Sequence, residues 1–201
     1  SEMCIRDRYE TALGCELAGG NSTGISGEDN AVQRYVQCVD NIDMSETLAV
    51  VILNSPAYAG TTYFGYTNQT KVVEFAIAYC PVIYDLQSES FRQVLVHEAV
   101  GHGFAKLEDE YAYQENGTIS SKEIKNVQYL QTLGWAQNVD FTSDPSQVLW
   151  SAFLNDNRYV SEKLGVFEGA CTYIKGAYRP SEESMICLLY TSPSPRDRTR
   201  S

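Results

Sequence analysis

The stretch Val94 to Tyr111 reads VLVHEAVGHGFAKLEDEY, and the rest of the chain is organised around it. It holds both histidines of the 201-residue sequence, His97 and His102, together with Glu98 and an acidic cluster further on. Neutral imidazoles and a carboxylate are common ligands of a hydrolytic zinc ion, and a glutamate beside the first histidine can act as the general base. The stretch therefore indicates metal-assisted hydrolysis of a carbonyl compound.

The spacing of the two histidines differs from the common zinc-peptidase motif HExxH, because His97 and His102 are five residues apart and not four. At roughly 100° per residue, a separation of four places two side chains about 40° apart around a regular helix, and a separation of five about 140°. Either the motif is accidental, or the helix carries a one-residue π-bulge that turns His102 back towards His97. Gly101 and Gly103 make such a distortion easier.

The run HEAVGHGFAKLEDEY (97–111) resembles the IgA peptidase family of bacterial metallopeptidases, the igalysin branch of the metzincins. The resemblance covers residues 19–186, most of the chain. It implies an α/β, metzincin-like zinc-peptidase domain in which a mixed, twisted sheet packs against the active-site helix and the C-terminal half is irregular and helical. Four further segments are similar to that family in order and spacing: AYAGTTYF (57–64), DPSQVLWSAFLND (144–156), KLGVFEGACTY (163–173) and GAYRPSEESM (176–185).

The resemblance also implies roles for single residues. It makes His97 and His102 zinc ligands and Glu98 the general base that activates a zinc-bound water. Met185 matches the methionine turn that underlies the metal site in metzincins and packs against it without binding the metal. Zinc is accordingly the expected cofactor.

The third zinc ligand is less clearly indicated. In metzincins the chain bends after the active-site helix so that a downstream side chain reaches the metal, and in this branch the resemblance implies an acidic one. Asp109 fits best, and Glu108 and Glu110 are the alternatives. The bend usually begins at a glycine, whereas Ala105 and Lys106 stand there in this sequence, so the path of the bend stays open.

Ahead of this stretch, the sequence predicts several strands. The continuous apolar run 47–53 is typical of a strand buried on both faces. Residues 57–80 favour two strands joined by a polar turn near 67–70. By the resemblance, the strand 72–80 would be the sheet edge that lines the cleft and pairs with an extended substrate, although an ordinary interior strand explains the pattern as well.

Two helices are predicted in the same half. Residues 31–39 show apolar positions at helical spacing, and Asp29 or Asn30 could cap that helix. Ser88 or Ser90 could cap the active-site helix, whose apolar face would anchor the ligands.

The C-terminal half contains weaker signals. Ser120-Ser121 followed by Glu123 predicts a helix start, and residues 166–173 could be a short strand or an extended crossing segment. Asp144-Pro145 is expected to open another helix. Its inward positions would be Val148, Leu149, Phe153 and Leu154.

Both ends of the chain differ in composition from the rest. SEMCIRDR (1–8) and CLLYTSPSPRDRTRS (187–201) resemble peptides translated from sequencing-adapter read-through. We expect these ends to be artefacts that flank a catalytic domain over 9–186, itself cut at both ends. No signal peptide is visible, so secretion or a place in the cell envelope is expected from the resemblance alone.

Between those ends lie four cysteines, Cys15, Cys38, Cys80 and Cys171, none in a CxxC pair that would indicate a second metal site. Four cysteines allow three disulfide pairings, and four buried thiols explain them equally well.

Composition and charge restrict the function further. A hydrophobic content of 43% can support a sizeable core. The sequence contains no run of eighteen apolar residues, so no membrane span is expected. The net charge of -11 argues against a nucleic-acid partner. The sequence therefore predicts a zinc endopeptidase whose substrates are extracellular or host polypeptides, IgA being only one possibility. The alternatives are a catalytically inactive protein- or glycan-binding module, against which the intact Glu98 argues, and a zinc amidase that acts on cell-wall material.

Overall fold

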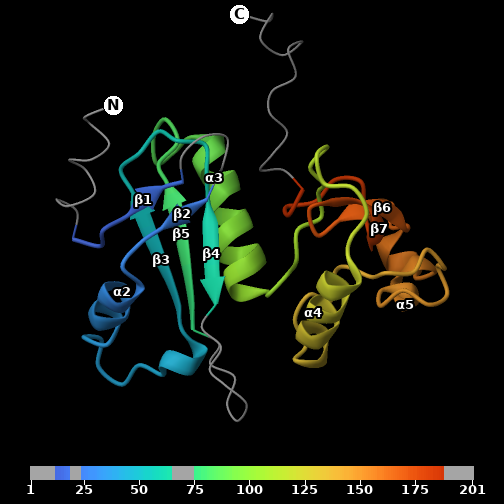
Figure 1. The fold of residues 1–201 in the computed structure, drawn as a ribbon, viewed down its shortest axis with the longest axis horizontal. Helices are drawn as coiled ribbons and strands as arrows, with labels where there is room; N and C mark the ends of the chain where they lie inside the picture. Colours follow the sequence, from blue (N-terminus) through green and yellow to red (C-terminus); the bar gives the residue numbers. More distant parts are fainter. Residues whose placement is uncertain (1–11, 19–23, 65–74, 188–201) are drawn as a thin grey trace, which may run out of the picture. The chain divides into compact units, whose positions relative to one another are not determined.

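The N-terminal half of the chain is built on a three-stranded sheet and the continuous helix that carries the two histidines (Figure 1). The computed structural model describes residues 12–18, 24–64 and 75–187, which form two compact units on either side of the Phe104–Ala105 bond. In chain order the elements of the first unit are β1 (Glu16–Leu17), β2 (Ile25–Ser26), α2 (Asp29–Val36), η1 (Met44–Glu46), β3 (Leu48–Leu53), β4 (Thr61–Phe64), β5 (Ala76–Pro81), α3 (Glu89–Leu95) and η2 (Val96–Phe104).

The central strand of this sheet is β5, which runs parallel to β3 and antiparallel to β4, so the sheet is mixed as predicted. All six residues of β5 are buried. Ile77 and Tyr79 belong to the hydrophobic cluster that also contains residues of α2, whereas the alternate positions Ala76, Ala78 and Cys80 are small. Because alternate residues of a strand face opposite sides, the small side chains let η2 approach the other face of β5 closely.

The structure decides the placement of two predicted strands, and one of them differs from its prediction. The apolar run 47–53 does form β3, but β3 is an outer strand of the described sheet, where Val50 and Ile52 are 39% and 54% exposed. For the segment 72–80 the sheet edge and an interior strand were both open, and the segment contributes the central strand β5. A continuous apolar run fits either position, and only the pairing decides between them. The predicted turn lies within residues 65–74, outside the described part of the chain.

The helix predicted over 31–39 forms as α2, but its start differs from the prediction. Neither Asp29 nor Asn30 caps it, because both lie inside the helix and the N-cap residue Glu28 makes no side-chain cap bond. Instead, Oδ1 of Asp29 accepts a hydrogen bond of 2.7 Å from the hydroxyl of Tyr79. Burial of Tyr79 and this bond raise the pKa of its hydroxyl, so the pair links α2 to the sheet.

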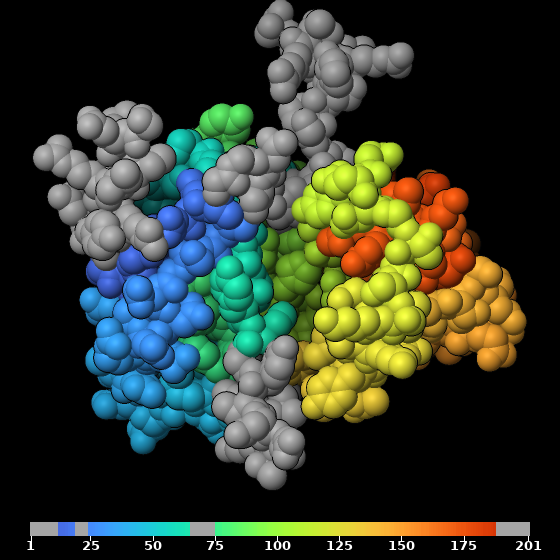
Figure 2. Space-filling model, viewed as in Figure 1, coloured from blue at the N-terminus to red at the C-terminus, as the bar shows by residue number. Residues whose placement is uncertain are grey.

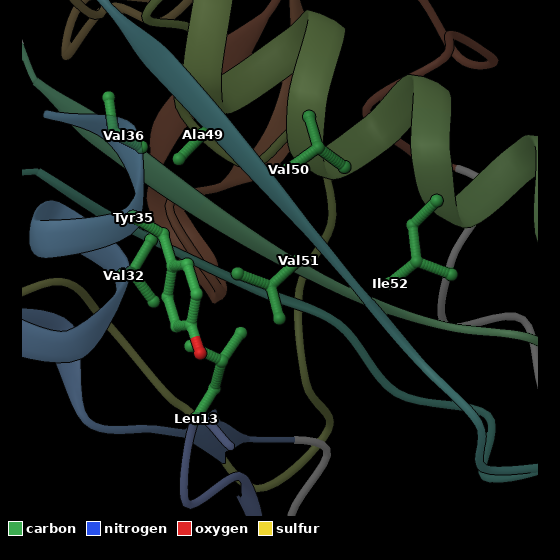
Figure 3. Close-up of a pocket in the computed structure, with 8 residues that line it drawn as sticks. All are labelled: Leu13, Val32, Tyr35, Val36, Ala49, Val50, Val51 and Ile52. Atoms are coloured by element: carbon green, nitrogen blue, oxygen red, sulfur yellow. The ribbon is translucent and has the colours of Figure 1, made fainter. Parts of the chain in front are cut away.

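A shallow pocket lies where α2 meets β3 (Figure 3). The space-filling view shows α2, in blue, forming part of the surface of this unit (Figure 2). The lining is aliphatic except for Tyr35, so it carries no group suited to hydrolysis. Its residues are Leu13, Val32, Tyr35, Val36, Ala49, Val50, Val51 and Ile52.

The helix that carries the two histidines begins at Ser88, one of its two predicted caps, whose Oγ accepts a hydrogen bond of 3.1 Å from the backbone N–H of Phe91. The helix first runs as the α-helix α3, with Phe91 and Val94 buried, and continues without a break into the π-helix η2. Within the described residues, no helix has both the length and the apolar character needed to cross a membrane.

The second unit combines helices with a β-hairpin around a small core. Its elements are α4 (Ser121–Thr132), α5 (Ser151–Leu154), η3 (Asn157–Glu162), β6 (Phe167–Ala170) and β7 (Tyr173–Arg179). Ser120 caps α4 as predicted, since its Oγ accepts from the N–H of Glu123. Most of α4 faces solvent (yellow in Figure 2), and Val127 is its buried residue. The core is Ile119, Val127, Ala136, Val139, Ala170, Cys171 and Ala177.

The other two C-terminal predictions are confirmed in part. The segment 166–173 supplies the strand β6, which pairs antiparallel with β7 across a turn in which Cys171 and Thr172 have positive φ. The helix expected from Asp144 is reduced to turns and the four-residue α5. Of its predicted inward residues Val148 is buried, but Leu149 and Phe153 are exposed.

No disulfide joins the described cysteines, so thiol reactivity should follow burial. Burial and the nearby Glu98 carboxylate raise the pKa of Cys80 to about 12, whereas Cys38 is exposed. Only the thiolate reacts with the reagent. A pKa of about 12 in place of 9.0 lowers the thiolate fraction of Cys80, and hence its alkylation rate, about 1,000-fold at pH 8. Peptide mapping after iodoacetamide treatment of the native protein should find Cys38 modified and Cys80 intact. In denaturant both should react, and rapid native labelling of Cys80 would contradict the buried strand.

Candidate metal centre

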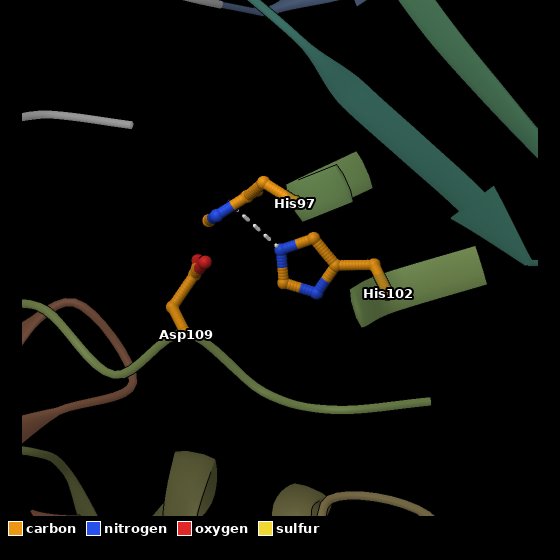
Figure 4. A group of neighbouring side chains, drawn as sticks. All are labelled: His97, His102 and Asp109. Atoms are coloured by element: carbon orange, nitrogen blue, oxygen red, sulfur yellow. Dashed lines mark hydrogen bonds between the residues drawn. The ribbon is translucent and has the colours of Figure 1, made fainter. Parts of the chain in front are cut away.

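The π-helix η2 brings the two histidines together. Its i→i+5 hydrogen bonding stacks residues five apart roughly above one another, which a regular helix does for residues four apart. Nε2 of His97 and Nε2 of His102 are 3.0 Å apart, and their rings meet edge to face at an angle of 80° (Figure 4). This is the geometry that the π-bulge interpretation predicts, although the π-helix extends over nine residues and not over a single inserted one.

Glycine contributes to η2 through packing. A Cβ atom on Gly103 would lie 2.6 Å from Cδ1 of Leu48 on β3, closer than side-chain atoms can approach. A side chain at position 103 would therefore require the Leu48 side chain to move. Neither Gly101 nor Gly103 has a positive φ, so the distortion that the sequence predicts needs no left-handed residue.

Asp109 follows η2 by five residues and joins the two histidines in one group. One ligand atom from each of His97, His102 and Asp109 lies within 4.8 Å of the other two (Figure 4). Between η2 and Asp109, Lys106 has a φ of 56°, which is left-handed. The carbonyl of Lys106 accepts from the N–H of Ala136 at 2.8 Å, and its ammonium lies 5.8 Å from the ring centre of Trp135.

The two alternative third ligands have contacts within the second unit. Oε1 of Glu108 accepts a hydrogen bond of 3.2 Å from the N–H of Asp109. Glu110 is buried, and its Oε1 accepts a bond of 2.9 Å from the side-chain amide of Asn138. Burial raises the pKa of Glu110, while the bonds from Asn138 and Ser184 oppose that rise. Glu110 is therefore suited to hold its own segment in place.

Asn138 is a site residue that sequence reasoning missed. Its amide accepts from the N–H of Glu108 at 2.9 Å and donates to the carbonyl of Glu108 at 2.8 Å, as well as to Oε1 of Glu110. The carbonyl of Asp109 accepts from the N–H of Cys171. These bonds fix the backbone on both sides of Asp109. Asn138 stands 29 positions after Asp109, between the buried residues Ala136 and Val139, and no local pattern indicates the contact.

Glu98 is buried, with 2% of its surface exposed, on the part of η2 that packs on the sheet. The hydroxyl of Thr62, on β4, donates to Oε2 of Glu98 at 2.8 Å and lies 2.9 Å from its backbone carbonyl oxygen. The charge of Glu98 contributes to the raised pKa values of Cys80 and Tyr63. The sequence marked Glu98 by its position beside His97, but gave no sign of its partner Thr62.

Met185 lies in the turn 185–187 of the second unit, beside the fully buried Ile186, and its side chain is 46% exposed. Its role beneath the metal stays a prediction.

The donor set fits a zinc ion. Two imidazoles and one carboxylate are a three-ligand set found in catalytic zinc sites, which keep the fourth position open. With zinc–nitrogen bonds of about 2.0–2.1 Å, tetrahedral geometry separates two nitrogen ligands by about 3.3 Å. The 3.0 Å between the two Nε2 atoms needs only a small adjustment to reach that distance.

Comparison with known families agrees with this arrangement. The family model of IgA peptidase M64 matches residues 25–161, more than half of the chain, including both histidines, Glu98 and the acidic cluster. The chain belongs to the IgA peptidase M64 family. Membership confirms the family predicted by resemblance and makes the chain a peptidase, with polypeptide as its substrate class. M64 is a metallopeptidase family, and the group of His97, His102 and Asp109 could hold its metal. No curated protein matches the sequence significantly.

Proposed function

We propose that this M64 chain is a zinc-dependent endopeptidase of the metzincin type. His97, His102 and Asp109 would hold the metal, and Glu98 would act as general base. The observation that carries the proposal is the π-helix η2, which places two histidines five residues apart with their Nε2 atoms 3.0 Å from each other. A π-helix is rare and is often found at functional sites.

Zinc would supply a Lewis acid that polarises the scissile carbonyl and lowers the pKa of a coordinated water towards about 7. The protein's own contribution to the proton transfer comes from Glu98. Its carboxylate would accept a proton from the attacking water and later pass it to the leaving amine. This carboxylate is buried, and electrostatic interactions are stronger in the protein interior than in bulk water.

The first unit is suited to hold the histidines before a metal arrives. His97 is buried at 1% exposure, and η2 contacts all three strands of the sheet. In the second unit, the bonds of Asn138 and Cys171 hold the backbone around Asp109. Within each unit, ligands that are fixed by their surroundings lose less freedom when a metal binds. We propose Met185 as the residue of the methionine turn on the basis of the family resemblance.

We also propose that the peptidase acts outside the cell or in the cell envelope, on extracellular or host polypeptides. This part rests on the resemblance to the igalysin branch. The identity of the natural substrate is a separate question, because a fold and a zinc site do not determine which polypeptide is cleaved.

Metal removal tests the proposal. The purified protein should contain about one zinc per chain by elemental mass spectrometry and should cleave an unfolded polypeptide. Dialysis against a strong zinc chelator should abolish cleavage, and one equivalent of zinc should restore it. A protein that binds no zinc and cleaves nothing would favour the inactive binding module. Turnover of muropeptides in preference to polypeptides would favour the cell-wall amidase.

A further inference from the structure

We propose that Thr62, on strand β4, is a positioning residue for the carboxylate of Glu98, and that Gly60 provides the space in which that carboxylate lies. The inference rests on the proposed role of Glu98 as general base. It adds a second element of the fold, the β4 strand, to the residues that prepare the site for catalysis.

The first observation is the double contact of the Thr62 hydroxyl. Oγ1 lies 2.8 Å from Oε2 of Glu98 and 2.9 Å from its backbone carbonyl oxygen, so one hydroxyl contacts both the side chain and the backbone of Glu98. It carries a single proton, and a bond to a carboxylate is stronger than one to a neutral carbonyl. We therefore expect the proton to point to Oε2 while the carboxylate is ionised.

The second observation concerns Gly60, which immediately precedes β4 and is buried. A Cβ atom at this position would lie 2.5 Å from Oε1, 2.7 Å from Cγ and 2.9 Å from Cδ of Glu98. All three distances are shorter than real side-chain contacts, so residue 60 can only be glycine while Glu98 keeps this conformation. The carboxylate is thus held at one oxygen by Thr62 and bounded at the other by the backbone of Gly60.

These contacts have a catalytic consequence. A general base must hold its oxygen within hydrogen-bond reach of the proton it abstracts, and a glutamate has three rotatable side-chain bonds that would otherwise spread that oxygen over several positions. The anchor is rigid, because Thr62 pairs with Ala78 of the buried central strand β5. A small displacement of a reacting group can reduce the rate about 100-fold.

The test compares three variants of the zinc-loaded full chain. Thr62→Val keeps the shape but removes the hydroxyl, Thr62→Ser keeps the hydroxyl, and Tyr63→Phe removes a neighbouring β4 hydroxyl that donates to the carbonyl of Ile25 and not to Glu98. Thr62→Val should lower kcat about 10- to 100-fold, the usual effect of losing a hydrogen bond to a charged group, with KM and zinc content within about twofold. Thr62→Ser should recover kcat to within about threefold, and Tyr63→Phe should leave it within about twofold.

Repeating the Thr62→Val substitution in a Glu98→Gln chain distinguishes positioning of Glu98 from a general disturbance of β4. In a Glu98→Gln chain, adding Thr62→Val should reduce the residual rate by less than about twofold, because the residue that Thr62 positions is already disabled. An equal loss in both backgrounds, or an unchanged kcat in Thr62→Val alone, would overturn the inference while leaving the role of Glu98 intact. Full activity of Glu98→Gln by itself would overturn both.

Discussion

Replacing Glu98 by glutamine is expected to reduce kcat/KM for peptide cleavage by a factor of about 10² to 10⁴, with about one zinc per chain retained. Glutamine has the shape of glutamate but cannot accept the proton of the attacking water. The Thr62 hydroxyl can still donate to the amide oxygen, so the side chain should keep its place. The retained zinc distinguishes loss of the base from loss of the metal.

The measurement pairs steady-state kinetics on a fluorogenic peptide with metal analysis of the same samples. Glu89→Gln is the matched control, because Glu89 stands at the start of the same continuous helix, is exposed and forms an ion pair with Arg92 at the surface. That exposed pair contributes little to stability, so the control should behave as the parent protein. Activity of Glu98→Gln within about threefold of the parent would rule out Glu98 as the general base.

The histidine spacing shows how much of this site the sequence could predict. Five residues between His97 and His102 left two interpretations open, and only the helix geometry, with its Nε2–Nε2 distance of 3.0 Å, separates them. The local signals that were reliable depend on a few neighbouring residues. Ser88 and Ser120 cap the helices that they precede, because a cap needs only its own side chain and the N–H three residues on.

Predictions that depend on distant pairing were less reliable, although the local cap expected at Asp29 or Asn30 also failed. The apolar runs before the active-site helix gave the strands β3 and β5, but their composition did not show that β5 is central and β3 is an outer strand of the described sheet. Thr62 and Asn138 were missed for the same reason. Thr62 meets Glu98 across 36 positions, and Asn138 meets Glu108 across 30. Threonine and asparagine are too common in loops and strands to mark such contacts.

The missing glycine after the active-site helix shows a different limit. Left-handed backbone favours glycine but does not require it, and Lys106 adopts φ 56° here. The carbonyl of Lys106 and its side chain both contact the segment around Trp135 and Ala136, which can offset the strain. The preference for glycine at this position is thus outweighed by contacts that form only in the folded chain.

The second large effect is expected at the third ligand, where three neighbouring carboxylates can be compared by the same substitution. Asp109→Asn should lower zinc affinity by more than about 100-fold, because it removes the charge of a direct ligand, and loss of an outer-shell partner alone typically costs about 10- to 100-fold. Glu108→Gln and Glu110→Gln should stay within about tenfold of the parent. Titration against zinc chelators of graded affinity measures all four proteins on one scale.

The expected order follows from the contacts of the three side chains. The amide oxygen of glutamine can still accept the bond that Asn138 gives to Glu110, so Glu110→Gln should keep the segment in place and retain the metal. Glu108 similarly accepts from the N–H of Asp109, a bond that glutamine can also accept. Among the described residues, Asp109 supplies the carboxylate that groups with the ligand atoms of both histidines within 4.8 Å. If Glu108→Gln lost zinc while Asp109→Asn kept it, the ligand would be Glu108, and the chain around residues 108–110 would have to turn when the metal binds.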